Sequence, residues 1–98
     1  DRLTIDLDKR TALLDGHPVD LTTNEFAALA LLARNAGKVL NRDQILQELR
    51  GMDCDAFNRS VDIAVSRLRQ KLEDNPKSPE FIKTVWGSGY IFIGNYAD

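Results

Sequence analysis

Residues 58–74, NRSVDIAVSRLRQKLED, gather the side chains of this chain that are best suited to binding chemistry. Within residues 58–72, four basic side chains stand against a single acid, a local excess of three positive charges. They are Arg59, Arg67, Arg69 and Lys71, against Asp62. Guanidinium and ammonium groups bind phosphates and the acceptor edges of guanine. The segment therefore predicts a surface for an anionic ligand, although the net charge of the whole chain, −2, argues mildly against nucleic acid.

Helical spacing, about 100° per residue, divides this segment into two faces. The apolar stripe predicted to pack on the core is Val61, Ala64, Val65, Leu68 and Leu72. The opposite face is Arg59, Ser66, Gln70, Ile63 and Arg67, with Ser60 and Lys71 at one margin and Asp62 and Arg69 at the other. A cationic fork, small hydroxyls and an apolar group that can meet a thymine methyl are what a DNA major groove accepts. We therefore predict a recognition helix, against the alternative of a solvated surface helix.

The first element that must support this helix is an N-terminal sheet. LTIDLD over 3–8 alternates apolar and polar residues with the period of a strand. TALL over 11–14 and VDL over 19–21 read as two further short strands, and DKR and DGHP supply the turns between them. The pattern predicts an antiparallel meander.

The period changes at Thr22, where a helix begins. Thr22 and Glu25 form a capping-box pattern, and Leu21 and Phe26 a hydrophobic staple. Apolar residues then recur at helical spacing until Gly37, which predicts the end of this helix.

The same pattern repeats for a second helix. Asn41 precedes Gln44 by three residues, and Leu40 is placed to contact Ile45. The helix is predicted to end at Gly51, and a loop over 51–57 leads to the third helix, over about 58–74.

The last element is a hairpin over 81–93, FIKTVWGSGYIFI, whose WGSG supplies a tight turn. Strands, three helices and a hairpin within 98 residues predict one α+β domain, a winged helix-turn-helix, against the alternative of a generic α+β domain. The hairpin tip of such a domain reaches the adjacent minor groove or its phosphates. Trp86, at the start of the turn, either takes part in that contact or folds back onto the core.

Other kinds of function find little support. His17 is the only histidine and has no paired nucleophile, and no phosphate-binding glycine loop or metal-ligand spacing is present. We therefore expect no catalytic residues, no metal and no cofactor. Cys54 stands alone, which fits a reducing compartment, and no apolar run reaches the ~18 residues of a membrane span. The net negative charge leaves open a winged helix that binds protein rather than DNA.

Three stretches resemble the effector domain of OmpR/PhoB-type response regulators. They are LTTNEFAALALLARNAGKVLNRDQIL, NRSVDIAVSRLRQKLED and IKTVWGSGYIF, and the likeness runs from about Leu3 to Phe92. The resemblance implies a bacterial, cytoplasmic domain that binds double-stranded DNA sequence-specifically and regulates transcription as the output of a two-component phosphorelay. It also implies an N-terminal receiver domain, expected to be absent from this fragment, which begins at Asp1.

Such domains have several partners, which the resemblance carries over as expectations. A sensor kinase acts through the receiver domain. The effector domain alone is a monomer and pairs on DNA, at direct-repeat promoter sites. The loop at 51–57 corresponds to the segment through which family members meet RNA polymerase.

The resemblance also assigns roles to single residues. Groove-facing positions match Ser60, Ile63 and Arg67, with Trp86 at the wing tip, where many relatives have an arginine. Phosphate-contacting positions match Arg50, Arg59, Ser66, Arg69, Thr84 and Tyr90, and Lys71 joins them from the helix margin. Arg50 stands where a tryptophan is common in the family, and Ser66 where an arginine is common.

Overall fold

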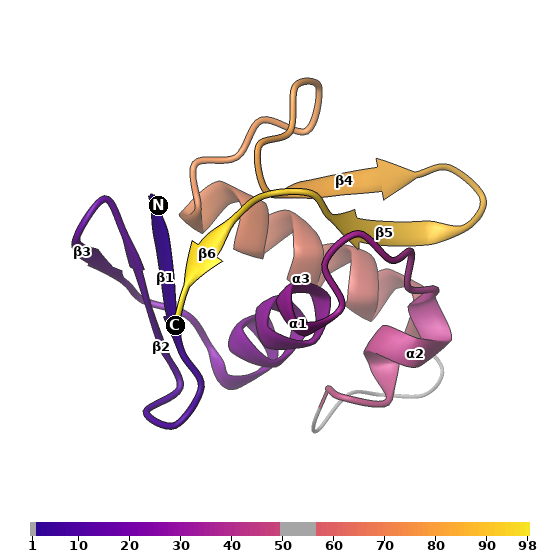
Figure 1. The fold of residues 1–98 in the computed structure, drawn as a ribbon. Helices are drawn as coiled ribbons and strands as arrows, with labels where there is room; N and C mark the ends of the chain where they lie inside the picture. Colours follow the sequence, from indigo (N-terminus) through magenta and orange to yellow (C-terminus); the bar gives the residue numbers. More distant parts are fainter. Residues whose placement is uncertain (1, 50–56) are drawn as a thin grey trace.

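A four-stranded sheet forms one end of the molecule. The computed structural model describes residues 2–49 and 57–98, with the backbone alone at 57–59. Strands β1 (Leu3–Asp6), β2 (Thr11–Leu14) and β3 (His17–Val19) form the predicted antiparallel meander. A strand that the sequence did not predict, β6 (Tyr96–Ala97), runs parallel to β1 and gives the order β3-β2-β1-β6. The two ends of the chain therefore meet in one sheet (Figure 1).

The third strand starts two residues earlier than predicted. Asp15 and Gly16 both have positive φ, 52° and 82°, the conformation that two-residue hairpin turns favour. The turn is complete after Gly16, so Leu14 pairs directly with His17. The prediction of a strand over 19–21 was wrong in its bounds because it assigned four residues to a turn that needs only two.

The first two helices begin where their caps predicted. In α1 (Thr23–Arg34) and α2 (Arg42–Leu46), the cap side chains of Thr22 and Asn41 accept the backbone N–H three residues later, and both capping boxes are complete. However, α2 is shorter than predicted. The N–H groups of residues 48 and 49 bond to carbonyls only three residues back, so the chain tightens into a turn after Leu46.

The third helix, α3 (Phe57–Lys71), ends about three residues before the predicted residue 74. Glu73 adopts a left-handed φ of 56°, and the N–H of Asp74 bonds to the carbonyl of Arg69 at 2.8 Å. This geometry closes a helix C-terminus. The carboxylate of Asp74, which is buried, then accepts three successive backbone N–H groups, from residues 80, 81 and 82. The end of α3 is thereby fixed to the start of the next strand.

The predicted wing is present as the hairpin of β4 (Ile82–Val85) and β5 (Gly89–Phe92). Its strands are paired up to Val85 and Gly89, so residues 86–88 form the tip. Leu40 and Tyr90 exchange two backbone hydrogen bonds, of 2.8 and 2.9 Å, which attach β5 to the segment between α1 and α2. The tip lies at the opposite end of the molecule from the N-terminal sheet (Figure 1). The fold is the predicted winged helix-turn-helix.

Candidate nucleic-acid interface

Helix α3 presents the two faces that its sequence predicts. The predicted core stripe is buried, with each of its five residues at most 4% exposed. On the opposite side, Ile63 is 47% exposed, and Ser66, Arg67 and Gln70 are also exposed, while Ser60 is partly exposed. An isoleucine half in solvent, one turn from an arginine, is an apolar group beside a long cation. Together these residues form the outward face of α3.

Arg67 is free to bind an anion. It forms no ion pair among the described residues, whereas Arg2, Arg42 and Lys71 each contact a carboxylate. Arg67 also lines one shallow depression with Asp62, Ile63, Ser66 and Gln70. The depression follows the outward face of α3. Ile63 supplies its apolar surface, and the other four residues supply hydrogen-bond donors and acceptors.

Trp86 projects from the wing tip into solvent. Its side chain is 90% exposed, far more than any other large hydrophobic residue in the described part of the chain. The alternative that this indole folds back onto the core is therefore wrong. Gly87 and Ser88, which complete the tip, are small and exposed, so Trp86 is the only bulky group the tip offers.

Three predicted contact residues meet where α3 packs against the wing: Arg69 of α3, Thr84 of β4 and Tyr90 of β5. The Nη2 of Arg69 donates to the Thr84 hydroxyl at 2.6 Å, and its Cζ lies 5.4 Å from the centre of the Tyr90 ring. The Tyr90 hydroxyl donates to Oδ1 of Asp62, which also accepts from Nε of Arg42 at 2.9 Å. Burial, followed by this bond to a carboxylate, raises the pKa of Tyr90 to about 12. The hydrogen bond that Arg42 donates to Asp62 likewise raises the pKa of Arg42.

Sequence spacing does not reveal the parts played by Arg42 and Asp62. They are 20 positions apart on different helices, and a spacing of that size carries no periodic signal. The helical projection placed Asp62 at a margin of the outward face of α3 but could not show what it contacts.

Lys71 is not brought together with the outward face. Its Nζ lies 2.6 Å from Oε1 of Glu25, a carboxylate only 4% exposed at the start of α1. The same oxygen accepts the backbone N–H of Thr22 in the capping box. Of the remaining predicted residues, Arg50 lies outside the described residues, and Arg59 is placed in α3 by its backbone alone.

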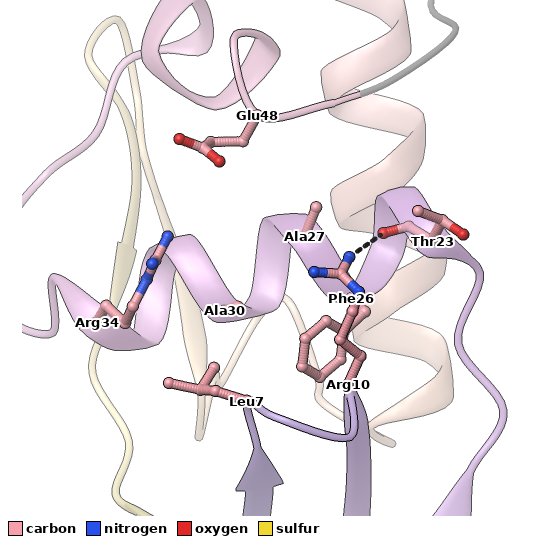
Figure 2. A pocket seen from close by; sticks show the side chains of 8 residues that line it. All are labelled: Leu7, Arg10, Thr23, Phe26, Ala27, Ala30, Arg34 and Glu48. Carbon is pink, nitrogen blue, oxygen red and sulfur yellow. Dashed lines mark hydrogen bonds between the residues drawn. The ribbon is translucent and has the colours of Figure 1, made fainter.

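A second hollow, of about 370 Å³, lies away from these residues, between α1 and the turn after β1 (Figure 2). The Arg10 guanidinium lies 4.9 Å from the centre of the Phe26 ring and donates to the Thr23 carbonyl. Arg34 and Glu48 stand at its rim (Figure 2). None of the residues predicted to contact DNA lines it, and it has no paired nucleophile and base.

The described ranges, 2–49 and 57–98, hold no group of three or more histidine, cysteine, aspartate or glutamate side chains that could bind a metal ion. No helix within these ranges is long and apolar enough to cross a membrane.

A helix-turn-helix followed by a β-hairpin defines the winged-helix class, and here the third helix exposes Ile63 and Arg67. The family model "Transcriptional regulatory protein, C terminal" matches residues 16–92. The chain therefore belongs to this family, the C-terminal DNA-binding domains of OmpR/PhoB-type regulators, which is a family of transcription regulators and not of enzymes.

Individual relatives agree with this assignment. The chain is 47% identical over 90 residues to the transcriptional regulatory protein RstA of Escherichia coli, matching 92% of this chain and 38% of RstA. It is 40% identical over 96 residues to AruR of Pseudomonas aeruginosa, matching 96% of this chain and 39% of AruR. The chain thus spans about two fifths of the length of these curated relatives.

Solved structures show the same fold. The Klebsiella pneumoniae RstA DNA-binding domain in complex with RstA box superimposes with a TM-score of 0.83 at 47% identity, covering 95% of this chain and 92% of that one. The response regulator DrrB of Thermotoga maritima, an OmpR/PhoB homologue, superimposes with a TM-score of 0.85 at 39% identity, covering 96% of this chain and 42% of DrrB.

Proposed function

We propose that this domain binds double-stranded DNA sequence-specifically and regulates transcription as the output domain of a two-component response regulator. The observation that carries the proposal is the outward face of α3, where Ile63 and Arg67 are exposed directly opposite a fully buried stripe. A helix with that division can enter a major groove without disturbing the core. The complex of the K. pneumoniae relative with its RstA box supports the same partner for this chain.

The exposed residues divide by chemistry. Ser60, Ile63 and Arg67 meet base edges, because a hydroxyl, an apolar group and a guanidinium match the donors, methyls and acceptors of the major groove. Trp86 enters the adjacent minor groove. The phosphate contacts are Arg50, Arg59, Ser66, Arg69 and Thr84. Arg69 has five donors and uses one on Thr84, whose own hydroxyl proton remains available.

Lys71 and Tyr90, the other two predicted phosphate contacts, act through the fold instead. A phosphate only accepts hydrogen bonds, and the single proton of the Tyr90 hydroxyl is already given to Asp62. The Lys71 ammonium is paired with Glu25. Both residues therefore stabilise the fold that carries the DNA-binding surface and do not contact DNA themselves.

Membership of the family supports a proposal for the wider setting of the domain. The relatives are more than twice as long as this chain, and a receiver domain that a sensor kinase phosphorylates accounts for the difference. We place residues 1–98 as the single effector domain, in the bacterial cytoplasm. It is a monomer alone and pairs on direct-repeat promoter sites. The loop at 51–57 meets RNA polymerase.

The test compares two isoleucines of nearly equal exposure. Ile63, on the outward face of α3, is 47% exposed, and Ile93, just beyond β5, is 44% exposed. Selection from random DNA first supplies a specific duplex. Ile63→Asp should keep the wild-type melting temperature and weaken binding to that duplex at least tenfold, because a carboxylate is brought toward phosphates and a methyl contact is lost. Ile93→Asp should bind like the wild type.

Arg67→Ala completes the comparison. It should cost about 1–3 kcal/mol on the selected duplex and relax the preference at one base pair. If selection enriches no sequence, or if Ile63→Asp and Arg67→Ala both bind as the wild type does, α3 is not a recognition helix.

A further inference from the structure

Five polar side chains connect the recognition helix to the wing. They are Arg42 of α2, Asp62 and Arg69 of α3, Thr84 of β4 and Tyr90 of β5, and we call them the helix–wing cluster. Its bonds join the body of α3 to the strands of the hairpin near the tip, whereas the Asp74 carboxylate, just beyond the end of α3, holds the start of β4.

One end of the cluster is Asp62. A single oxygen, Oδ1, accepts from Arg42 at 2.9 Å and from the Tyr90 hydroxyl. Tyr90 is only 5% exposed and the Asp62 side chain is 44% exposed, so this bond is partly buried. If the tyrosine swings away, Oδ1 of Asp62 loses one of its two donors, and hydrogen bonds to charged groups are among the stronger ones in proteins.

The other end is Arg69, two helical turns further along α3. It donates to the Thr84 hydroxyl at 2.6 Å and lies over the Tyr90 ring. Its Nε–H is buried without a hydrogen-bond partner in the described part of the chain. Nε therefore does not hold the guanidinium. Its position is set by the bond from Nη2 to Thr84 and by the contact with the Tyr90 ring. Arg42 lies 5.9 Å from the same ring centre, so two cations border it.

The position of the cluster on the hairpin is informative. Thr84 and Tyr90 are partners directly across the two strands. Only one further pair, Val85 with Gly89, separates them from the tip that carries Trp86. Asp62 and Arg69 thus hold both strands of the wing at one level, close to the tip.

We infer that Asp62 is a positioning residue for DNA binding, acting through Tyr90 to set the wing tip against the outward face of α3. The inference rests on the proposed function, in which α3 and the wing contact one duplex together. Two contacts on a rigid ligand are strongest when their spacing is fixed in advance, because ordering a mobile hairpin on binding costs free energy. A carboxylate at this margin would by itself repel phosphates, and its ion pair with Arg42 compensates its charge.

The first experiment measures the wing in the free protein. Spin labels at Gln70→Cys on α3 and Ser88→Cys at the tip, in a Cys54→Ser background, report the distance between the two surfaces. The distribution should be narrow in the parent and clearly broader after Tyr90→Phe, which removes only the hydroxyl. Tyr96→Phe, the same change in the N-terminal sheet, should leave it narrow. Equal widths for the parent and Tyr90→Phe would overturn the inference, whatever the domain binds.

The second experiment measures the Kd for the selected duplex. Tyr90→Phe and Asp62→Ala should each weaken binding about tenfold. The double variant should be no weaker than either single one, and Asp62→Asn, which keeps an acceptor oxygen, should recover part of the loss. In a Trp86→Ala background Tyr90→Phe should cost little, because the contact being positioned is already gone.

A purely structural role for Asp62 predicts a different pattern. The melting temperature would fall while the Kd stayed unchanged, or the losses from Tyr90→Phe and Trp86→Ala would add in full. Either result would overturn the inference. Loss of specific binding in Ile63→Asp tests the proposed function independently, since Ile63 has no part in the cluster.

Discussion

At the scale of single residues, two exposed apolar side chains distinguish this domain. Ile63 and Trp86 are 47% and 90% exposed, on α3 and at the wing tip. Exposed apolar residues are common one at a time. Here both are expected to contact DNA, and they lie on two separate elements. Their exposure is therefore better explained by binding to a partner than by chance exposure of single apolar residues.

The proposed contact of Trp86 with DNA can be tested through the salt dependence of binding. An indole releases no counterions, so Trp86→Ala should cost about 1–3 kcal/mol, the value of a stacking contact, and leave the salt dependence unchanged. With about six phosphate contacts, the slope of log K against log salt should be near −5 in both proteins. Trp86→Arg should steepen the slope by about 0.9.

Trp86 is also the only tryptophan of the chain, so its fluorescence reports the contact directly. The emission should change as the specific duplex is added. Unchanged emission, together with wild-type affinity in Trp86→Ala, would mean that the indole stays in solvent on DNA.

At the scale of elements, the attachment of β5 decides where the wing lies. Gly89 has a φ of +139°, and a Cβ at this position would lie 2.0 Å from the carbonyl oxygen of Leu40. Leu40 pairs with Tyr90, the next residue, so any relief must separate β5 from the segment before α2. The absence of a side chain is required here by contact and by conformation together.

We predict that Gly89→Ala lowers the free energy of unfolding by about 3 kcal/mol or more and shifts the amide resonances of the wing. Gly87→Ala is the matched control, because Gly87 also has positive φ, +79°, but has no atom within 4 Å of the added Cβ. It should cost about 1–2 kcal/mol, from backbone strain alone. Denaturant titration measures both, and equal losses would contradict the close contact with Leu40.

At the scale of the whole molecule, the ion pair of the buried Glu25 with the partly exposed Lys71 joins the start of α1 to the end of α3. Desolvation raises the pKa of Glu25, but the hydrogen bonds from Lys71 and from the Thr22 backbone outweigh it, and the net effect lowers the pKa below 4.5. Because the folded-state pKa is the lower one, the carboxylate stabilises the fold fully above about pH 4.5 and loses this effect as the pH falls through the folded-state value.

Glu25→Gln should therefore be less stable than the wild type at pH 7, by about 1–3 kcal/mol, since Lys71 is partly exposed and the pair is partly screened. The difference should shrink below pH 4.5. Urea titrations between pH 3 and 7 measure it, with Glu48→Gln, at an exposed glutamate, as the control. A difference that is independent of pH would contradict the role of the ionised pair.

Lys71→Met tests whether this lysine stabilises the fold through Glu25 or contacts a DNA phosphate. It should lower stability at neutral pH while the Kd for DNA and its salt slope stay close to wild-type values. A slope reduced by about 0.9 would instead restore Lys71 to the phosphate contacts that the sequence proposed.

The sequence by itself determined the three helices, the hairpin and the faces of the recognition helix, but not the short strand β6. Capping pairs such as Thr22 with Glu25 are local, and the burial of Val61 opposite Ile63 follows from helical period alone. These signals depend on residues a few positions apart, which is why they could be predicted without coordinates. The bounds of α2 and α3 were less predictable, because their ends depend on backbone angles such as that of Glu73.

Only the tertiary structure decided which polar groups remain free for DNA. Asp62 lies 28 positions from Tyr90 and Lys71 lies 46 from Glu25, and the pairing of β6 with β1 joins the two ends of the chain. No periodicity spans such separations. A side chain on the surface of a helix becomes a DNA contact or a structural support according to what the rest of the chain brings beside it, and that is set by packing.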